Sequence, residues 1–309
     1  MKGGETMTSS ATTQNVVAAA VPKPRSRLHG ILHYLKRNVN LAIGFSMLAI
    51  LILFTLVGAF IVDLDDAYPG AVRAARPPSA EHLFGTDGQG RDLFTVAVAG
   101  TWVTLQIGFI AAGVGLTAGV LLGFISAYYG GTIDTIIRWA VDVFMTIPGF
   151  LILIVLAAML GGKVSTVGTG LIISLFLWAG PARVVRAQVL SLRERQFVLM
   201  AKLSGLSNME IIIEELIPNL LPFLGAQLVG SVMSAVYSSS GLAILGLGNL
   251  REPQLGTTLY WMQGQGALVR GLWWWVAVPV AFLCWAFVML YLISSGLDEL
   301  ANPRLRRRA

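Results

Sequence analysis

Charged residues are scarce in this sequence. Aspartate, glutamate, lysine and arginine together make up 12% of its 309 residues, whereas they supply about a quarter of a typical soluble domain. Hydrophobic residues make up 55%, and the mean hydropathy is +0.73. This balance excludes a pair of soluble domains and indicates an integral membrane protein surrounded by lipid. The net charge of +6 therefore bears on membrane orientation, and we expect no nucleic-acid partner.

Cysteine and an N-terminal hydrophobic run are also lacking. Cys284 is the single cysteine, so no disulfide can form within the chain. The first residues are polar and small, and they contain no apolar core long enough for a signal peptide. Such a composition buries too little apolar surface to order itself. We therefore interpret residues 1–35 as a cytoplasmic N-terminal tail.

Nucleotide-binding and catalytic motifs are absent as well. The segment AAMLGGKV at 157–164 comes nearest to a phosphate-binding loop, but Ala157 and Val164 stand where that loop needs glycine and a hydroxyl. His29 and His33 are four residues apart, and no glutamate follows His29 as a zinc protease requires. No serine, histidine and aspartate lie at one predicted depth. The sequence therefore predicts a chain that is not an enzyme and holds no metal or cofactor of its own.

Long hydrophobic runs are what the sequence does contain. A helix needs roughly 20 apolar residues to cross the hydrocarbon core of a bilayer, and six segments meet that requirement. Because backbone groups in lipid must bond within their own segment, such runs are helices rather than the short alternating strands of a barrel. The sequence thus predicts an all-α polytopic membrane protein with six transmembrane helices. The predicted spans are residues 41–62, 101–128, 133–160, 169–189, 221–245 and 273–295.

Lysine and arginine indicate the orientation of these spans. With the N-terminus in the cytoplasm, sixteen of the twenty-two lysines and arginines fall on the inner side, as expected from the excess of positive charge in cytoplasmic segments. We therefore expect both termini inside, with residues 301–309 as a basic cytoplasmic C-terminus. The three tryptophans at 273–275 then lie at the outer interface. There we expect them to form an aromatic belt rather than to stack on a substrate.

One polar stretch, FVLMAKLSGLSNMEIIIEELIPN at 197–219, interrupts the hydrophobic runs on the predicted cytoplasmic side. We expect a short helix that Gly205 ends. Ser207 and Glu210 then form a capping box, in which each side chain accepts a backbone N–H of the other residue. A second short helix follows and is expected to stop near Pro218. Two interpretations remain open: an amphipathic loop on the membrane surface, and a small convex bend that inserts into a groove of another protein.

This stretch resembles the cytoplasmic loop of bacterial ABC-importer permeases, which engages their ATPases. Ala201 matches the second alanine of that loop's E-A-A pattern, Gly205 its glycine and Pro218 its closing proline. Leu199 and Met200 replace the usual glutamate and first alanine, which argues against an acidic contact to the ATPase there. The resemblance implies that the ATPase-coupling residues are Phe197, Ala201, Lys202, Leu203, Ser204, Gly205, Leu206 and Ser207.

A second motif, HLFGTDGQGRD at 82–92, follows the first predicted span. By itself it is a turn cluster, because its glycines supply permissive backbone and its aspartates cap locally. It lacks the acidic spacing of a calcium loop. Its pattern is similar, almost residue for residue, to a signature of permeases in the dipeptide/oligopeptide importer family. The residues of this signature are His82, Phe84, Gly85, Thr86, Asp87, Gly90, Arg91 and Asp92.

Further matches occur in that family's order at 128–150, 183–195, 245–248 and 302–306. The chain thus resembles the second permease of an unlike pair, which implies the type I ABC importer permease fold. Residues 36–98 would hold the first transmembrane helix and an outer loop. Residues 99–300 would form a five-helix core, with coupling helices at about 193–218.

The same resemblance implies partners and a location. We expect an inner-membrane protein that contacts lipid, a second and unlike permease, two ATPase subunits that carry ATP and magnesium, and an extracytoplasmic substrate-binding protein. Short peptides are the expected substrate, and oligosaccharides or nickel are alternatives within the family. An ion-coupled secondary transporter is a further alternative, although it normally shows more spans and inverted halves. Residues of the substrate pathway are not predicted.

Three ionisable residues follow one another at four-residue spacing within the third predicted span. Asp134, Arg138 and Asp142 share one helical face. Opposite charges four residues apart on a helix satisfy one another. We therefore expect a structural ladder within one helix rather than a proton relay.

Overall fold

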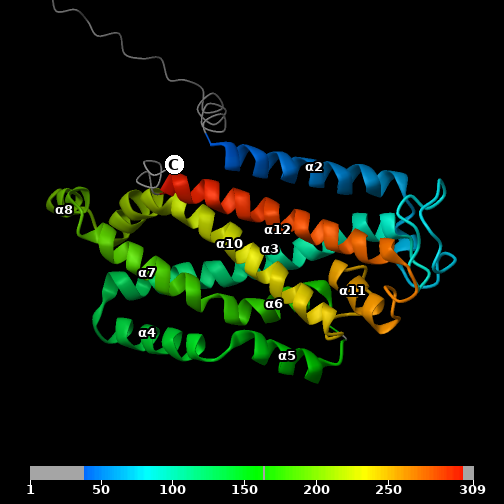
Figure 1. The fold of residues 1–309 in the computed structure, drawn as a ribbon. Helices are drawn as coiled ribbons and strands as arrows, with labels where there is room; N and C mark the ends of the chain where they lie inside the picture. Colours follow the sequence, from blue (N-terminus) through cyan, green and yellow to red (C-terminus); the bar gives the residue numbers. More distant parts are fainter. Residues whose placement is uncertain (1–37, 163, 302–309) are drawn as a thin grey trace, which may run out of the picture. The chain divides into compact units, whose positions relative to one another are not determined.

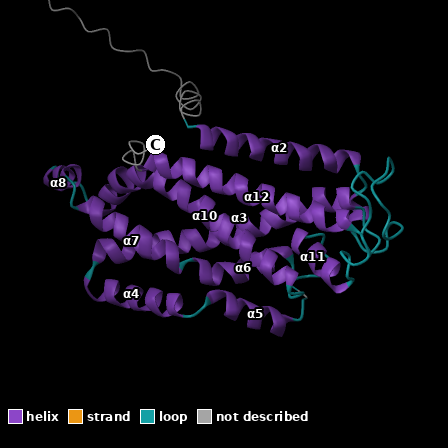
Figure 2. Cartoon of the chain, in the orientation of Figure 1, coloured by secondary structure: helices purple, strands orange, loops and turns teal. Residues whose placement is uncertain are grey.

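The computed structural model describes residues 38–162 and 164–301. The predicted N-terminal tail and nearly all of the predicted basic C-terminus lie outside these residues. All regular structure in the described part of the chain is helical (Figure 2).

Four helices are each long and apolar enough to cross a membrane. They are α2 (Val39–Ile61), α3 (Leu93–Tyr129), the run that ends with α10 (Ile217–Ile244), and α12 (Trp273–Ala301). Two further spans are bent pairs. Helices α4 (Gly131–Thr146) and α5 (Gly149–Leu160) meet at 74°, and α6 (Thr166–Leu177) and α7 (Ala179–Arg193) meet at 47°. Counting each pair as one span gives the six predicted spans.

Proline accounts for both bends. Ile147 precedes Pro148 and has extended backbone angles, φ −82° and ψ 129°, because a proline disfavours the helical conformation in the residue before it. The second bend falls at Trp178, three residues before Pro181. Proline is tolerated in the first turn of a helix, where no intrahelical acceptor awaits its missing N–H. A new helix therefore starts at each site instead of the old one continuing.

Helix α3 is central and packs against α6, α7 and α10 (Figure 1). Its glycines permit the close approach. A Cβ on Gly119 would lie 2.5 Å from the Trp178 carbonyl oxygen, and one on Gly123 would lie 2.7 Å from that of Ala182. Small residues on facing helices let backbones pack tightly in a membrane, where van der Waals contact drives association. Helices α2 and α12 pack against each other, and α12 also packs against α10.

The polar stretch folds differently from the prediction beyond its bend. Helix α8 spans Gln196–Leu203, α9 spans Asn208–Glu210, and the π-helical segment η2 spans Ile211–Leu216 and leads directly into α10. The expected stop near Pro218 is therefore wrong. The Ile217 N–H reaches back to the Ile212 carbonyl, and this wider turn brings Pro218 into the first turn of α10, where proline is tolerated.

The aromatic belt is wrong for two of its three tryptophans. Trp273 is 63% exposed, but Trp274 is only 9% exposed and Trp275 is fully buried. Trp274 and Trp275 pack with Leu93 of α3 and with residues of α11 (Leu255–Gly264), a helix that the sequence analysis did not predict. Because α11 folds back over the start of α12, these indoles belong to a protein core rather than to the lipid interface.

Candidate functional site

Helix α8 ends in a tight glycine cap. Gly205 has φ +84°, in the left-handed region that glycine enters without strain. Its N–H donates to the Lys202 carbonyl at 3.1 Å, and the Leu206 N–H donates to the Ala201 carbonyl at 3.2 Å. This pair of bonds is the Schellman arrangement, in which the residue after the glycine packs back on the helix. The chain therefore reverses sharply at residues 202–207, which we call the 202–207 bend.

The two sides of this region differ in burial. Val198 and Ala201 are buried in a core with Val185 and Val189 of α7 and Phe124 of α3. Phe197 and Leu206 are partly buried against the same core. Residues 202–205 and Ser207 are exposed, and a side chain at Gly205 would meet open space. The predicted coupling residues therefore divide into an anchored base and a projecting tip.

Polar contacts hold the bend on the neighbouring helices. The predicted capping box is present: the Ser207 N–H donates to Glu210 Oε2 at 2.6 Å, and the Glu210 N–H donates to Ser207 Oγ at 3.4 Å. The Tyr128 hydroxyl at the end of α3 donates to the Asn208 side chain. The Arg193 guanidinium donates to the Ala127 carbonyl at 2.8 Å. The end of α7 and the residue that follows the bend are thus both tied to the end of α3.

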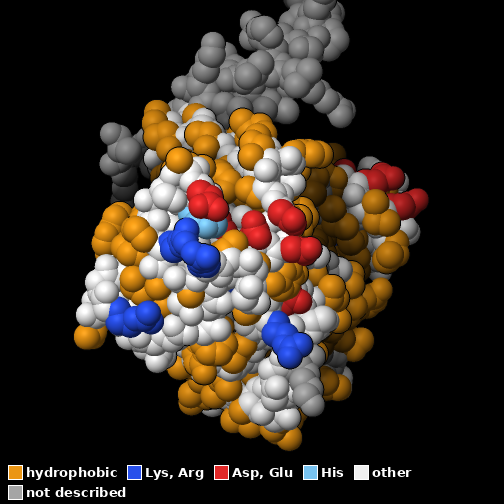
Figure 3. All heavy atoms as spheres, turned by 90° about the vertical axis from the view of Figure 1, so that its right-hand side faces the viewer, with side chains coloured by type: hydrophobic (Ala, Val, Ile, Leu, Met, Phe, Trp, Pro, Cys, Tyr) orange, Lys and Arg blue, Asp and Glu red, His pale blue; other side chains and the backbone are white. Residues whose placement is uncertain are grey.

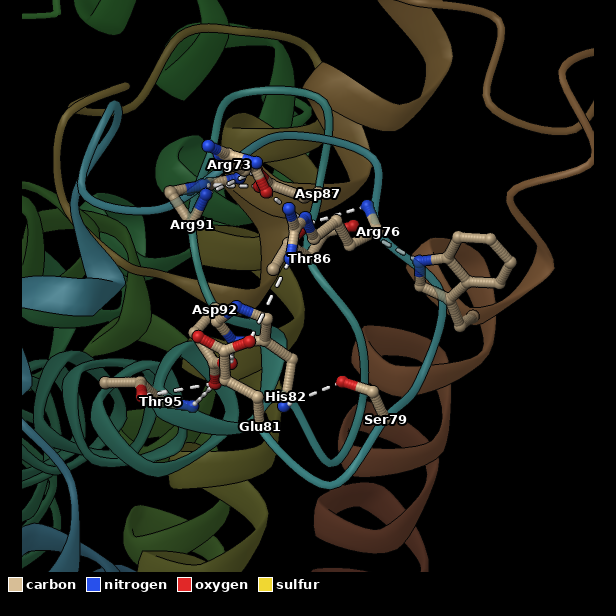
Figure 4. A network of polar contacts seen from close by, with 11 residues as sticks. Arg73, Arg76, Ser79, Glu81, His82, Thr86, Asp87, Arg91, Asp92 and Thr95 are labelled. Atoms are coloured by element: carbon tan, nitrogen blue, oxygen red, sulfur yellow. Dashed lines mark hydrogen bonds and ion pairs between the residues drawn. The ribbon is translucent and has the colours of Figure 1, made fainter.

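The predicted signature at 82–92 closes a long loop, residues 62–92, at the opposite end of the described helices (Figures 1 and 4). His82 Nδ1 lies 2.7 Å from Asp92 Oδ2. The other oxygen, Asp92 Oδ1, accepts the Thr95 N–H at 2.9 Å and so caps the first turn of α3. One carboxylate therefore fixes both the end of the loop and the start of a membrane span.

Asp87 and Arg91 form a buried ion pair within the same loop. Arg91 Nε donates to Asp87 Oδ2 at 2.6 Å, and both side chains are fully buried. Asp87 Oδ1 also accepts the backbone N–H groups of Gln89 and Arg91 at 2.8 and 2.9 Å. The Arg91 Nη atoms are buried and have no hydrogen-bond partner among the described residues. Among the described residues, the Asp87 carboxylate is therefore the group that compensates the buried positive charge of Arg91.

The remaining signature residues dock the loop. Thr86 Oγ1 donates to the Arg73 carbonyl at 2.7 Å and accepts the Arg76 N–H at 2.8 Å. Gly85 and Gly90 both have positive φ, and a Cβ at Gly90 would lie 2.5 Å from the Val72 carbonyl. Phe84 packs against Phe94 of α3 with tilted rings whose centroids are 5.2 Å apart. The signature residues thus fold the loop on itself and pack it against the start of α3.

The surface at this end of the molecule mixes both charges. In Figure 3 acidic and basic side chains stand among uncharged surface, and hydrophobic side chains occupy the periphery. The pKa of Asp66 in this loop is raised, mainly by burial and also by the nearby carboxylates of Asp63 and Asp92.

Residues 246–248 of the 245–248 motif line a cavity of about 570 Å³, to which Gly161 and Arg251 also contribute.

The prediction that Asp134, Arg138 and Asp142 pair with one another along α4 is wrong, because both acidic side chains pair with arginines of α7. Asp134 pairs with Arg186 of α7 at 2.5 and 2.7 Å, and Ser126 of α3 donates to the same carboxylate at 2.5 Å. Asp142 pairs with Arg183, also of α7. Arg138 forms no ion pair within the described part of the chain. Because α4 packs against α7, the acidic side chains reach across to that helix rather than along their own.

Among residues 38–162 and 164–301, no group of three or more histidine, cysteine, aspartate or glutamate side chains is placed to hold a metal ion. The predicted ATPase-coupling residues and the predicted signature residues lie at opposite ends of the helices (Figure 1). Sequence reasoning missed the Asp134–Arg186 and Asp142–Arg183 pairs. Their acidic residues were visible, but only the packing of two helices far apart in the sequence reveals the partners.

Comparisons with known proteins match this chain to membrane components of transport systems. A family model described as "Binding-protein-dependent transport system inner membrane component" matches residues 119–307. The chain is 31% identical over 273 residues to the dipeptide transport system permease protein DppC of Bacillus subtilis (strain 168), covering 88% of this chain and 84% of that protein. It is 28% identical over 272 residues to the oligopeptide transport system permease protein OppC of the same organism, covering 88% of each.

A solved structure shares the fold. An inward-facing conformation of the MetNI methionine ABC transporter superposes with a TM-score of 0.52 at 21% identity, covering 67% of this chain and 95% of that chain. At this identity the likeness concerns the arrangement of helices alone.

Proposed function

Because the chain belongs to the family of binding-protein-dependent transport system inner membrane components, we propose that it is the permease subunit of an ATP-driven importer of short peptides. Relatives named as dipeptide and oligopeptide permeases support the choice of substrate. Partner ATPase subunits bind ATP and magnesium and hydrolyse the nucleotide. A second, unlike permease completes the membrane channel, and an extracytoplasmic binding protein delivers the peptide.

The 202–207 bend is the observation that supports this mechanism best. Its tip is exposed, while Val198 and Ala201 at its base are buried against α3 and α7. A protein that grips the tip moves the base, and the tightly packed base transmits that movement to the helices around it. Val198 and Ala201 are buried in the protein, whereas the apolar side chains of Leu199, Met200 and Leu203 on the same helix are exposed and are the surface that a partner would cover.

The arrangement of the ends supports an orientation for the chain. Helix α8, the start of α2 and the end of α12 lie at one end of the described helices, and the 62–92 loop lies at the other (Figure 1). The first end is the cytoplasmic one, where the ATPases dock. Both termini are then inside the cell, and the 62–92 loop faces the binding protein.

Transport follows from switching between two arrangements of the helices. Nucleotide binding draws the ATPases together and pulls on the bend, so α7 and α10 change tilt with it. The bends at Pro148 and Trp178 divide two spans into halves. Such breaks let the inner half of a span move while the outer half stays packed. The peptide route opens alternately to each side, and each ligand biases one of the two states.

Reconstitution of the complete importer tests this proposal. The chain carries an affinity tag and is expected to copurify with ATPase subunits and a second permease. Proteoliposomes with the binding protein are expected to accumulate radiolabelled trialanine only when ATP is supplied. Uptake of oligosaccharide without uptake of peptide would overturn the substrate, and peptide uptake by this chain alone without ATP would overturn the mechanism.

A further inference from the structure

Two charged pairs join α4 and α7, which belong to the third and fourth predicted membrane spans. Asp142 lies roughly 16 Å along α4 from its first residue, Gly131. Asp142 and Arg183 therefore lie farther from the end that carries α8 than Asp134 and Arg186 do, and all four belong to helices that form candidate membrane spans.

These charges are not enclosed by the chain itself. The side chains of Asp142 and Arg183 are 56% and 51% exposed, and Arg138 is exposed as well. Ionisable groups within membrane spans are rarely in contact with lipid, because a charge in hydrocarbon costs several kcal/mol, and they face a bundle interior or a water-filled cavity instead. The face of α4 and α7 that carries them therefore points away from lipid.

A cleft lies along this face. Its volume is about 200 Å³, and its lining includes Ile137, Arg138, Asp142, Arg183 and Arg186. Three guanidinium groups stand against two carboxylates, those of Asp142 and Asp134. Asp142 is paired with Arg183, and Asp134 is paired with Arg186. Arg138 is the arginine of this cleft that forms no ion pair within the described ranges, so the cleft retains one positive charge.

The helices are broken next to the cleft. Phe144, near the end of α4, packs edge-to-face against Trp178 at the break before α7, with ring centroids 5.1 Å apart. Irregular backbone at membrane depth is tolerated where it is buried in protein or lines a cavity. In transporters, interrupted helices near the midplane mark the substrate site. Two breaks lie side by side here, and the guanidinium of Arg138, which forms no ion pair with another described residue, lies about two turns away along α4.

We propose that this cleft lines the substrate route and that Arg138 binds the carboxylate of a peptide in transit. This inference rests on the function proposed above, since a peptide substrate supplies a terminal carboxylate. A guanidinium binds a carboxylate with two parallel hydrogen bonds. Arg183 and Arg186 are already held by their acidic partners, so the net positive charge of the cleft is that of Arg138. The exposed setting makes the contact weak, as passage requires, because a tightly held substrate would not leave.

Uptake measurements on the reconstituted importer test the role of Arg138. The substrates are radiolabelled trialanine and its C-terminal amide, which lacks the negative charge. Arg138→Gln is expected to lower the rate for trialanine about tenfold, the size of one charge-assisted contact, and to change the rate for the amide much less. Arg138→Lys is expected to retain most of the trialanine rate. Equal losses for both peptides, or no loss, would overturn the proposal.

A labelling experiment gives a readout that does not depend on uptake. Cys284 is the single cysteine, so Cys284→Ser with Ile137→Cys places one thiol of this chain in the cleft. In the assembled importer, a negatively charged methanethiosulfonate is expected to react faster than a positively charged one. Arg138→Gln is expected to remove this preference, and trialanine is expected to slow the reaction. Ile136→Cys, an exposed position on the same turn of α4 that does not line the cleft, is the control and is expected to show no preference.

The labelling also distinguishes the other occupants of this face. A thiol at position 137 that reacts with neither reagent would mean that a partner subunit or lipid covers the cleft, and the proposal would be wrong. The failure of the importer itself is separate: a complex that takes up no peptide refutes the proposed function. A complex that takes up peptide, but whose transport and labelling ignore Arg138, refutes only the role of this cleft.

Discussion

The indole N–H of Trp274 donates a hydrogen bond to the Thr86 carbonyl at 3.1 Å, although 188 residues separate them in the sequence. Thr86 belongs to the 62–92 loop, and Trp274 lies in the first turn of α12. A Cβ on the neighbouring Gly85 would lie 2.8 Å from the Trp274 ring, so the loop packs directly on this indole. The 82–92 signature therefore joins the loop to the last membrane span as well as to α3.

Asp92 is expected to be the key residue at the start of α3. Replacing it with alanine removes the cap on Thr95 and the contact with His82, and loss of a cap alone costs about 1 kcal/mol. We expect Asp92→Ala to lower the midpoint of thermal unfolding in detergent by several degrees. Asparagine also caps helices, so Asp92→Asn is expected to fall between alanine and the wild type. Equal midpoints for all three proteins would contradict the capping role.

Asp87 is expected to matter more, because it balances a buried charge. Removing one partner of a buried ion pair costs about 3–5 kcal/mol, since the other charge stays buried and uncompensated. We expect Asp87→Asn to lower the yield of folded protein and its thermal midpoint strongly. The double variant Asp87→Asn with Arg91→Met removes both charges and is expected to recover much of the loss. Asp65→Asn, at an exposed position of the same loop, is the control and is expected to behave as the wild type.

The predictable part of this fold is the part that local sequence controls. The all-α fold of an ABC importer permease is confirmed, because long apolar runs can only be helices in lipid. The capping box of Ser207 and Glu210 and the glycine cap at Gly205 were also predicted correctly. Each depends on residues within a few positions of one another, so the sequence pattern contains the whole interaction.

The unpredictable part depends on contacts between distant segments. Trp275 looked like a membrane-interface residue because nothing in its neighbourhood indicated that α11 covers it. Asp134 looked like a partner of Arg138, four residues away, but tertiary packing offers it Arg186 of α7 instead. Pro218 was expected to end a helix, and the π-helical turn before it removes that requirement. In all three cases the deciding group comes from packing or backbone geometry that residue spacing does not reveal.

Asp66 gives a prediction about pH. Burial and neighbouring carboxylates raise its pKa in the folded protein, so the folded state binds this proton more tightly than the unfolded state does. Its contribution to stability is therefore present at acidic pH and is lost as the pH rises through the folded pKa. We expect Asp66→Asn to raise the thermal midpoint slightly at pH 7, with the gain disappearing as the pH is lowered below the pKa. A gain that is constant from pH 7 to pH 4 would exclude titration of Asp66 as its cause.

Gly205 is expected to separate ATPase docking from folding. The glycine has φ +84° and faces open space, so Gly205→Trp adds bulk at the tip of the bend without disturbing the buried base. We expect this variant to insert into the membrane normally and to copurify with at least about tenfold less ATPase. A tenfold loss of affinity corresponds to about 1.4 kcal/mol, and losing several tight contacts at the bend costs more than that. The matched control is Gly70→Trp, since Gly70 has φ +86° and also faces open space, but lies in the 62–92 loop. Both variants carry the same backbone strain, so equal loss of ATPase from the two would assign the effect to that strain and would contradict docking at the 202–207 bend.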